Sequence, residues 1–385
     1  MNKEKLSNLY DIGSSKRVFQ SEWREKGVPF YRAREIARLS EDGYVDNELF
    51  IDEDLYEEYT EKYGRPQPGD VMVTGVGTLG VCYVVKPRDK FYFKDGNILW
   101  FKQKAPDRIM PEYLVKAFES KEVKDFISKN SSGTTVGTFT IQTANRMEIT
   151  LPSIDQQEQI IERISKLESI IKKRQNELVK LDELIKARFV EMFGDPVSNP
   201  KLWKMVELGS LTEVGSSKRI FEKEYVPEGI PFYRTKEIVE LSKGNQISTE
   251  LFITRERFDE IKRQYGVPKA GDLLISAVGT IGVIWIVDGK NDFYFKDGNL
   301  IRVDASDKFN SVFMKSVLEN LISEYKNQMS SGTAYAALTI SGLTKMKVYD
   351  VPMDFQKDFA DFVSQVDKSK SRKELNLKTE IRLVS

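Results

Sequence analysis

The spacing of apolar residues predicts domains that mix short strands with amphipathic helices. Four segments are rich in β-branched and aromatic residues and are bounded by glycine or charge, as is typical of strands: Val71–Thr74, Val81–Val85, Phe91–Phe93 and Ile98–Phe101. Apolar residues recur at helical spacing over Pro111–Ser128 and over Lys308–Gln328, which predicts a helix in each segment. We expect a final strand to end at Leu151 and another at Val351, each directly before a proline.

A much longer helix is predicted over Ile154–Phe189, because no glycine or proline interrupts this stretch before Gly194. At 1.5 Å per residue it would be roughly 50 Å long. Its apolar residues follow a heptad spacing with one charged interruption, at Arg174; they are Ile160, Ile164, Leu167, Ile171, Leu178, Leu181 and Ile185. One helix cannot bury such a seam alone, so the pattern favours a coiled coil over a helix packed on its own domain.

The expected partner helix is the C-terminal segment Asp354–Ser385. It begins with a similar seam, formed by Phe359, Phe362, Val363 and Val366. Beyond Val366, lysines stand where apolar residues are expected; they are Lys370, Lys373 and Lys378. The sequence therefore predicts a second pairing helix that is shortened.

The chain contains the same domain twice. Residues 11–101 align with residues 213–303 at a constant offset of 202 without a gap, and about four in ten positions are identical. GSSKR, PFYR, ELFI and FYFKDGN all return; they begin at Gly13, Pro29, Glu48 and Phe91 in the first copy. The period far exceeds that of solenoid repeats, so each copy is expected to be a self-standing domain with the same binding task.

One glycine motif resembles a nucleotide-binding turn, but its context argues against that function. Gly75–Gly80 matches GxGxxG, which requires a helix to begin inside it. The residues that follow, Val81–Val85, form a β-branched run, and the second copy has Ala277 in place of the first glycine. The sequence therefore predicts a strand–turn–strand with glycines in the turn.

Composition narrows the possible functions. The 385 residues carry 59 basic and 59 acidic side chains, so a nucleic-acid function needs local basic patches or partners that supply charge. The chain has no histidine, which removes His-based acid–base, nucleophilic and metal chemistry. The single cysteine, Cys82, corresponds to Ile284 in the second copy and is expected in the core of a cytosolic protein. No apolar run reaches membrane-spanning length.

Taken in order, these features resemble the specificity subunit of type I restriction–modification systems. The order is domain, long helix, domain, long helix, and PFYR-x-x-EI, KDGN, SSGT and P-x-x-x-Q occur once in each half. The resemblance covers essentially the whole chain. It implies an α+β fold with two homologous mixed α/β target-recognition domains, each of which reads one half of a bipartite DNA site. It also implies that the long helices pair as an antiparallel coiled coil, set the spacing and dock methyltransferase subunits.

On this resemblance we expect four segments. Target-recognition domain 1 takes residues 1–152, the central helix 153–195, target-recognition domain 2 residues 196–352, and the shortened C-terminal helix 353–385.

Basic and small polar residues that occur in both copies are the candidates for DNA contact. Lys16–Arg17 and Lys218–Arg219 lie in loops with glycine and serine, where they can reach phosphates or form ordinary solvated turns. Tyr31–Arg32 and Tyr233–Arg234 suit contact in a groove, although the tyrosines can equally be core residues. The SSGT loops add small polar candidates: Ser131, Ser132, Thr134, Ser330, Ser331 and Thr333. The KDGN segments are expected to be structural turns.

Base selection is expected where the two copies differ. Divergence is strongest in Gln20–Val28, Glu41–Asn47 and Asp52–Lys62, compared with the segments 202 residues later. Shared residues would then dock the duplex and divergent ones would read base edges. Because antiparallel helices relate the domains by a pseudo-twofold, two similar domains predict a gapped, nearly palindromic target.

The resemblance further implies partners and a division of labour. The partners are double-stranded DNA, two methyltransferase subunits and, through the complex, restriction/translocase subunits, with no membrane and a cytoplasmic location. S-adenosylmethionine, ATP and magnesium are expected on those subunits, while this chain carries no catalytic residue, metal or cofactor. An alternative is a non-enzymatic coiled-coil scaffold with duplicated domains for protein or another ligand; it explains the neutral charge but not the paired basic loops. A metal nuclease is disfavoured because no acidic cluster is duplicated.

Overall fold

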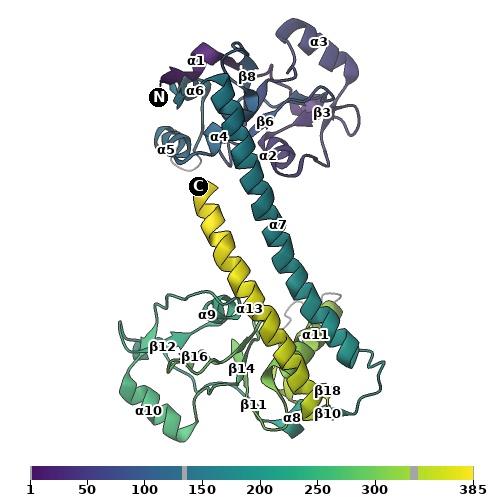
Figure 1. Ribbon diagram of the computed structural model, residues 1–385, viewed down its shortest axis with the longest axis vertical. Coiled ribbons are helices and arrows are strands. Elements are labelled where there is room, and N and C mark those ends of the chain that lie inside the picture. The colour runs from purple at the N-terminus through teal and green to yellow at the C-terminus, as the bar shows by residue number, and fades with distance from the viewer. Residues whose placement is uncertain (1, 132–136, 330–336, 385) are drawn as a thin grey trace. The chain divides into compact units, whose positions relative to one another are not determined.

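The computed structural model describes residues 2–131, 137–329 and 337–384 (Figure 1). The chain divides into two compact units. The first comprises residues 1–173 together with 377–385, and the second comprises residues 174–376. The two units repeat one architecture.

The first unit is built on a four-stranded antiparallel sheet of order β2–β8–β5–β6; its strands are Tyr10–Gly13, Ile98–Gln103, Val71–Thr74 and Cys82–Val84. A three-stranded sheet of order β4–β3–β7 contains Phe50–Ile51, Val28–Tyr31 and Tyr92–Phe93, and β3 and β7 are parallel. A small sheet pairs β1 (Lys3–Lys5) with β9 (Glu148–Thr150). The helices are α1 (Leu6–Leu9), α2 (Ala33–Asp42), α3 (Glu53–Tyr63), α4 (Pro111–Glu119), α5 (Lys121–Asn130) and α6 (Ile141–Arg146).

The central strand β5 explains why this sheet is covered on both faces. Successive side chains of a strand point to opposite faces. Val71 and Val73 pack with the α4 and α5 side chains Leu114 and Ile127, whereas Met72 packs with Ile36 of α2. All residues of β5 are buried, so its apolar run reflects two cores rather than one.

The second unit has the same sheets in the same order: β11–β17–β14–β15, β13–β12–β16 and β10–β18. Their strands are β10 (Met205–Glu207), β11 (Val214–Gly215), β12 (Ile230–Tyr233), β13 (Phe252–Ile253), β14 (Leu273–Ser276), β15 (Ile284–Ile286), β16 (Tyr294–Phe295), β17 (Leu300–Val303) and β18 (Lys347–Tyr349). Its shorter helices are α8 (Leu208–Leu211), α9 (Thr235–Ser242), α10 (Arg255–Gln264), α11 (Ser311–Met329) and α12 (Ile340–Thr344).

The helix predicted over residues 111–128 is interrupted in the structure. It consists of α4 and α5, which are separated at Ser120. The Ser120 hydroxyl accepts a hydrogen bond from the Val123 amide at 3.4 Å and so caps a new helix. The second unit has the single helix α11 here, which begins at Ser311 rather than at residue 308.

The GxGxxG segment is a hairpin turn, as predicted. β5 and β6 pair antiparallel on either side of it, and the Gly80 amide donates to the Thr74 carbonyl at 2.9 Å. Gly77 and Gly80 have φ values of 71° and 76°, which favour glycine. No helix opens at this turn, whose residues are all described, so the segment lacks the strand–turn–helix geometry of a dinucleotide-binding fingerprint.

Two long helices complete the fold: α7 (Ile154–Phe193, 40 residues) and α13 (Met353–Val384, 32 residues). Near the start of α7, Ile160 packs on the core of the first unit, and near its end Ile185 packs on the core of the second. The other predicted seam residues of α7 are half-buried: Ile164, Leu167, Ile171, Leu178 and Leu181.

Within the second unit, α7 and α13 run antiparallel and side by side (Figure 1). At the domain end the Phe359 ring lies 5.5 Å from Phe189, and Arg188 lies 5.8 Å from the Phe362 ring. Farther along, Lys370 and Lys373 pair with acids of α7, and the numbering of the partners falls as that of α13 rises. The predicted fold class, two mixed α/β domains with long antiparallel helices, is confirmed.

The apolar seam of α13 gives way to lysines beyond Val366, as the sequence indicates, but the contact with α7 continues. Lys370 is half-buried and lies 2.6 Å from Asp182, and half-buried Lys373 pairs with Glu177. The stripe then continues through half-buried Leu377, while Lys378 is exposed. The lysines therefore occupy seam positions, because α7 places acids opposite them, and the helix continues to Val384.

Candidate nucleic-acid interface

The GSSKR loop is hydrogen-bonded to the aromatic residues at the start of the FYFKDGN segment. In the first unit the Ser15 hydroxyl donates to the Phe93 carbonyl at 2.6 Å, and the Lys16 amide donates to the Tyr92 hydroxyl at 3.0 Å. The second copy repeats the latter bond, from the Lys218 amide to the Tyr294 hydroxyl at 2.6 Å. These contacts fix the backbone of each loop, so the lysine and arginine side chains of the loop extend from an ordered backbone.

The arginine of each loop is held by the aspartate of KDGN. Arg17 Nε lies 3.0 Å from Asp95 Oδ2, and Arg219 Nε lies 2.7 Å from Asp297 Oδ2. Both arginine side chains are mostly exposed, so the pairs contribute little stability but limit where the guanidinium can go. The KDGN turn therefore orients a cation in addition to closing a turn.

The lysine of each loop lies over an exposed tyrosine. Lys16 Nζ is 5.8 Å from the centre of the Tyr63 ring, and Lys218 Nζ is 5.1 Å from that of Tyr265. These are cation–π distances, and at exposed sites such contacts are worth about 0.5–1 kcal/mol. Each domain thus presents a lysine, an arginine and an aromatic ring together.

The second predicted set, Tyr31–Arg32 and Tyr233–Arg234, makes structural contacts instead. The Tyr31 ring stacks on Phe91 with centres 4.8 Å apart, and its burial raises its pKa. Arg32 Nη2 donates to the Glu35 carboxylate at 2.8 Å, and the same carboxylate accepts from the Arg32 amide at the start of α2. The second copy repeats this arrangement with Glu237.

The buried carboxylates at these helix starts are strongly bound by their arginines. Burial pushes the pKa of Glu35 upward, but hydrogen bonds from Arg32 and Arg34 outweigh it, and the pKa falls below its ordinary value. The pKa of Glu237 is lowered by Arg234 in the same way. Arg32 and Arg234 are thus committed to capping α2 and α9, and DNA contact by them stays a prediction.

Five of the SSGT residues lie outside the described residues: Ser132, Thr134, Ser330, Ser331 and Thr333. Ser131 is described, and its hydroxyl donates to the Ser128 carbonyl at 3.0 Å just after α5 ends. Its role in DNA contact stays a prediction.

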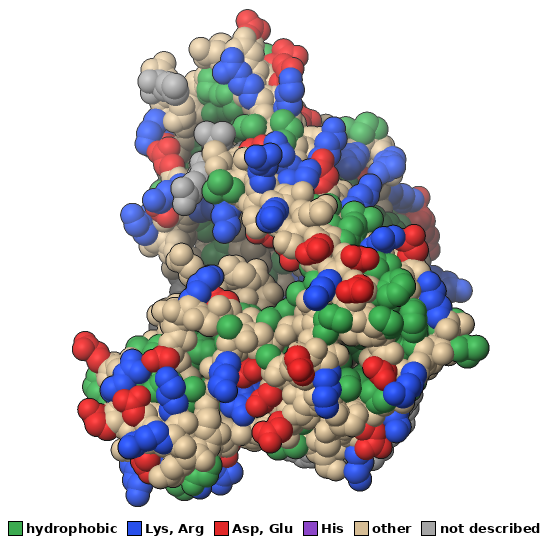
Figure 2. All heavy atoms as spheres, turned by 60° about the horizontal axis from the view of Figure 1, so that its bottom comes forward, with side chains coloured by type: hydrophobic (Ala, Val, Ile, Leu, Met, Phe, Trp, Pro, Cys, Tyr) green, Lys and Arg blue, Asp and Glu red, His purple; other side chains and the backbone are tan. Residues whose placement is uncertain are grey.

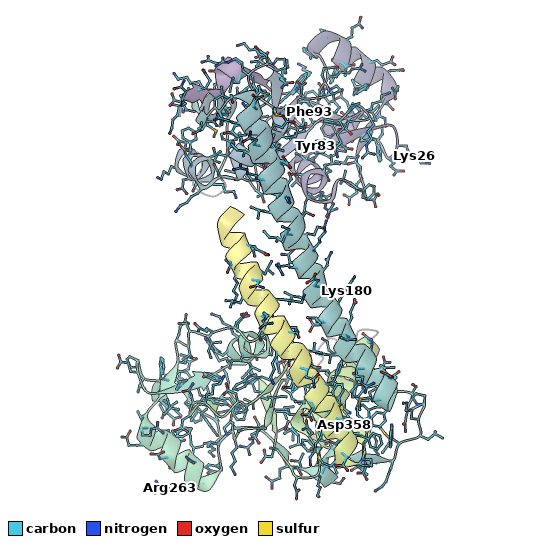
Figure 3. All side chains as sticks on the ribbon, viewed as in Figure 1. Lys26, Tyr83, Phe93, Lys180, Arg263 and Asp358 are labelled. Atoms are coloured by element: carbon cyan, nitrogen blue, oxygen red, sulfur yellow. The ribbon has the colours of Figure 1, made fainter. Side chains whose placement is uncertain are left out.

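The divergent segments lie mostly on the surface. Residues 20–28 form a 3₁₀ turn, η1 (Gln20–Glu22), and the loop that leads into β3; residues 52–62 form most of α3. Figure 3 shows Lys26 at the edge of the first unit and Arg263 near the end of α10, while Tyr83 and Phe93 lie inside. The shared residues Tyr92 and Phe93 are buried, so the copies share a frame and differ in what they expose.

Sequence reasoning missed a pair of buried glutamines that join each domain to its long helix. Gln157 accepts from the Met110 amide and donates to the Arg108 carbonyl, both at 2.8 Å. Gln356 accepts from the Asn310 amide at 2.8 Å and donates to the Val351 carbonyl at 2.7 Å. The P-x-x-x-Q spacing pointed to Gln156, which is exposed; the residue equivalent to Gln356 is its neighbour.

Other chemistry is little supported by the described residues. Among them, no group of three or more His, Cys, Asp or Glu could hold a metal ion. Cys82 is buried, and burial raises the pKa of its thiol. In the same part of the chain, no helix is both long and apolar enough to cross a membrane. Figure 2 shows basic and acidic side chains interspersed over the face that it presents.

Comparison with known proteins identifies similar chains of one kind. A putative type I restriction enzyme specificity subunit from Haemophilus influenzae is 33% identical over 154 residues, which are 40% of this chain and 37% of that protein. The MjaIX specificity subunit from Methanocaldococcus jannaschii is 27% identical over 212 residues, 50% of this chain and 47% of that protein. The matched parts thus make up less than half of either relative.

Two solved structures share the fold along the whole chain. A crystal structure of a type I restriction–modification S subunit from M. genitalium superposes with a TM-score of 0.52 at 16% identity, covering 100% of this chain and 93% of that one. A chain from a structure on complex assembly and conformational transition of the type I restriction–modification system gives 0.65 at 16% identity, covering 100% and 95%.

The family match covers both halves. Residues 1–181 and residues 200–383 each match the family described as the type I restriction modification DNA specificity domain. Each match contains one complete set of the sheets, the GSSKR loop and the KDGN turn described above. The chain therefore belongs to the family of type I restriction–modification DNA specificity domains and contains two of them.

Proposed function

We propose that this chain is the DNA-specificity subunit of a type I restriction–modification complex and that each domain binds one half of a bipartite duplex site. The observation that carries the proposal is the duplicated basic loop, with Lys16–Arg17 in one domain and Lys218–Arg219 in the other. Cations held in fixed positions bind phosphates and set the register of a protein on DNA. The chain itself performs no chemistry in this proposal.

The shared and divergent residues divide the work. The loops anchored by Asp95 and Asp297 dock each domain on the backbone in the same way, and the exposed segments around Lys26 and α10 select bases. Since the two frames are alike in topology and in the way they hold their cations, the half-sites they read are similar. We therefore infer a gapped, nearly palindromic site.

The rest of the complex supplies charge and catalysis. We infer that two methyltransferase subunits dock on the long helices and that restriction/translocase subunits join through them. S-adenosylmethionine, ATP and magnesium belong on those subunits. A chain with equal numbers of acidic and basic residues needs such partners to neutralise the phosphates of a long site.

The test is single-molecule methylome sequencing of cells that express this chain with and without its candidate methyltransferase subunit. A new bipartite methyladenine motif that requires both chains is the expected result. Two unrelated half-sites would contradict the near-palindrome while leaving the specificity function intact. The absence of both a motif and a stable complex would favour the coiled-coil scaffold, whose domains would not retain DNA.

A further inference from the structure

Each domain exposes a phenylalanine directly beside its basic loop. Phe19 is 58% exposed and Phe221 is 56% exposed, two residues after Arg17 and Arg219. A single exposed apolar side chain needs no explanation. Here the same ring is exposed at the same place in two domains that share about four in ten residues. This repetition needs an explanation, because core packing does not require an exposed ring.

The two rings are held in place in the same way. The Phe19 amide donates to the Glu22 carboxylate at 2.6 Å across η1, and the Phe221 amide donates to Glu224 at 2.8 Å across η2 (Glu222–Glu224). These contacts fix the backbone that carries each ring. The ring is therefore presented to solvent from an ordered turn.

The residues that brace this turn differ between the copies, although the ring does not. In the first copy the Tyr59 hydroxyl of α3 lies 3.5 Å from the Glu22 carboxylate. In the second, Arg257 of α10 pairs with Glu224 at 2.9 Å. The contacts that α3 or α10 makes to the glutamate have diverged, while the bond from the glutamate to the phenylalanine amide and the exposed ring are both retained, which points to a function on the outer side of the turn.

The surroundings of the rings indicate the kind of partner. Within three residues of Phe19 the chain places Lys16 and Arg17, and Tyr63 lies under the lysine. Cations beside apolar rings fit a partner with a charged backbone and uncharged flat groups between its charges. Duplex DNA has this composition, and phenylalanine is a side chain that proteins use as an apolar wedge in a DNA groove.

We infer that Phe19 and Phe221 are apolar DNA anchors, which contact bases or sugars in a groove while the adjacent lysine and arginine bind phosphates. The inference rests on the proposed function and names the contact surface of each domain. Because a ring neutralises no phosphate, its contribution to affinity releases no counterion and is independent of salt. The contribution of the neighbouring cations falls as salt rises.

The experiment measures the dissociation constant of the complex with its methyltransferase subunit for duplex DNA carrying the methylated motif, over a range of salt concentrations. Phe19→Ala and Phe221→Ala should each weaken binding by about tenfold, in line with alanine substitution of base-contacting aromatic residues. The slope of affinity against salt should not change. Lys16→Ala or Lys218→Ala should instead reduce that slope by about one.

Leu202→Ala is the matched control, since it truncates an apolar side chain that is 87% exposed and lies outside both the basic loops and the two long helices; it should leave binding unchanged. Phe19→Leu keeps an apolar side chain and should retain most of the affinity, which separates loss of contact from misfolding. Wild-type affinity in both alanine variants, or a loss that disappears at high salt, overturns the inference. If the wild-type complex binds no duplex, the proposed function itself fails.

Discussion

Side chains of the same chemical type in the repeated motifs have different roles in this fold. Arg32 and Lys16 are both cations in repeated motifs, yet the first is committed to a buried carboxylate and the second lies over a surface ring. The sequence could not separate them, because the distinction depends on Glu35, which becomes buried only when α2 packs on the sheet.

At this scale we predict that Glu35→Gln destabilises the first domain. The substitution removes the buried charged partner of the Arg32 guanidinium and leaves it only the exposed Glu48 carboxylate at 3.7 Å, at a cost of about 2 kcal/mol in the free energy of unfolding. Urea denaturation followed by circular dichroism measures it. Glu48→Gln, which alters a mostly exposed carboxylate of the same network, is the control and should cost under about 0.5 kcal/mol.

The lowered pKa values of Glu35 and Glu237 predict a dependence of stability on pH. Each carboxylate has a lower pKa folded than unfolded, so its contribution is complete above the unfolded pKa of about 4.3 and is lost as pH falls through the folded value. The stability difference between wild type and the double variant Glu35→Gln, Glu237→Gln should therefore shrink between pH 5 and about pH 3. A difference that stays constant would contradict the assignment; urea titrations at each pH supply the data.

The positions of the strands and of the long helices could be predicted from the sequence pattern. The break within a predicted helix could not. The β-branched runs marked β5, β6 and β8 within two residues. The break at Ser120 was missed because apolar residues continue through it, while the cap that makes it depends on one hydroxyl. Gln157 was missed because adjacent Gln156 fits the spacing equally well, and only the docked helix shows which one is buried.

This glutamine gives a prediction about how a domain holds its helix. Gln157→Ala leaves the Met110 amide and the Arg108 carbonyl without their side-chain partner, and should cost about 1–3 kcal/mol. Gln156→Ala changes an exposed side chain and should cost far less. Hydrogen exchange at the Met110 amide is the direct readout: faster exchange in the first variant alone is expected, and equal rates in both would count against the clamp.

The lysines of α13 give a second prediction at this scale. Lys370→Glu should weaken the helix pair by placing like charges opposite Asp182, and adding Asp182→Lys should restore it. The coupling energy of a pair whose acid is exposed, as Asp182 is, is about 0.2–1 kcal/mol. A double-mutant cycle on thermal unfolding determines it; additive effects would show that the two side chains do not interact.

At the scale of the whole molecule, most of what could be predicted from the sequence came from the internal repeat. The repeat predicted two equivalent domains, and the zero net charge required local basic patches or charged partners for a nucleic-acid function. The contact surface itself was only half visible. The basic loop is a sequence feature, whereas the exposure of Phe19 and Phe221 depends on the fold, since most phenylalanines of this chain are buried.

A neutral chain predicts weak autonomous DNA binding. We expect the isolated chain to bind duplex DNA far less tightly than the complex does, and to lose that binding steeply between 50 mM and 200 mM salt. Fluorescence anisotropy of a labelled duplex, with and without the methyltransferase subunit, compares the two. Equal affinity of the isolated chain and the complex would show that the basic residues of this chain alone are sufficient for binding to the phosphates.

The helix pair of the second unit is not uniform along its length. Near the start of α13 the rings of Phe189, Phe193 and Phe359 pack together, and farther along the two helices are joined by two lysine–carboxylate pairs. Aromatic burial is insensitive to ions, whereas exposed charge pairs are screened within about 8 Å at physiological ionic strength. The aromatic end of the helix pair is therefore stable at any salt concentration, whereas the end held by lysine–carboxylate pairs weakens as salt rises. The two helices should separate from the charged end first.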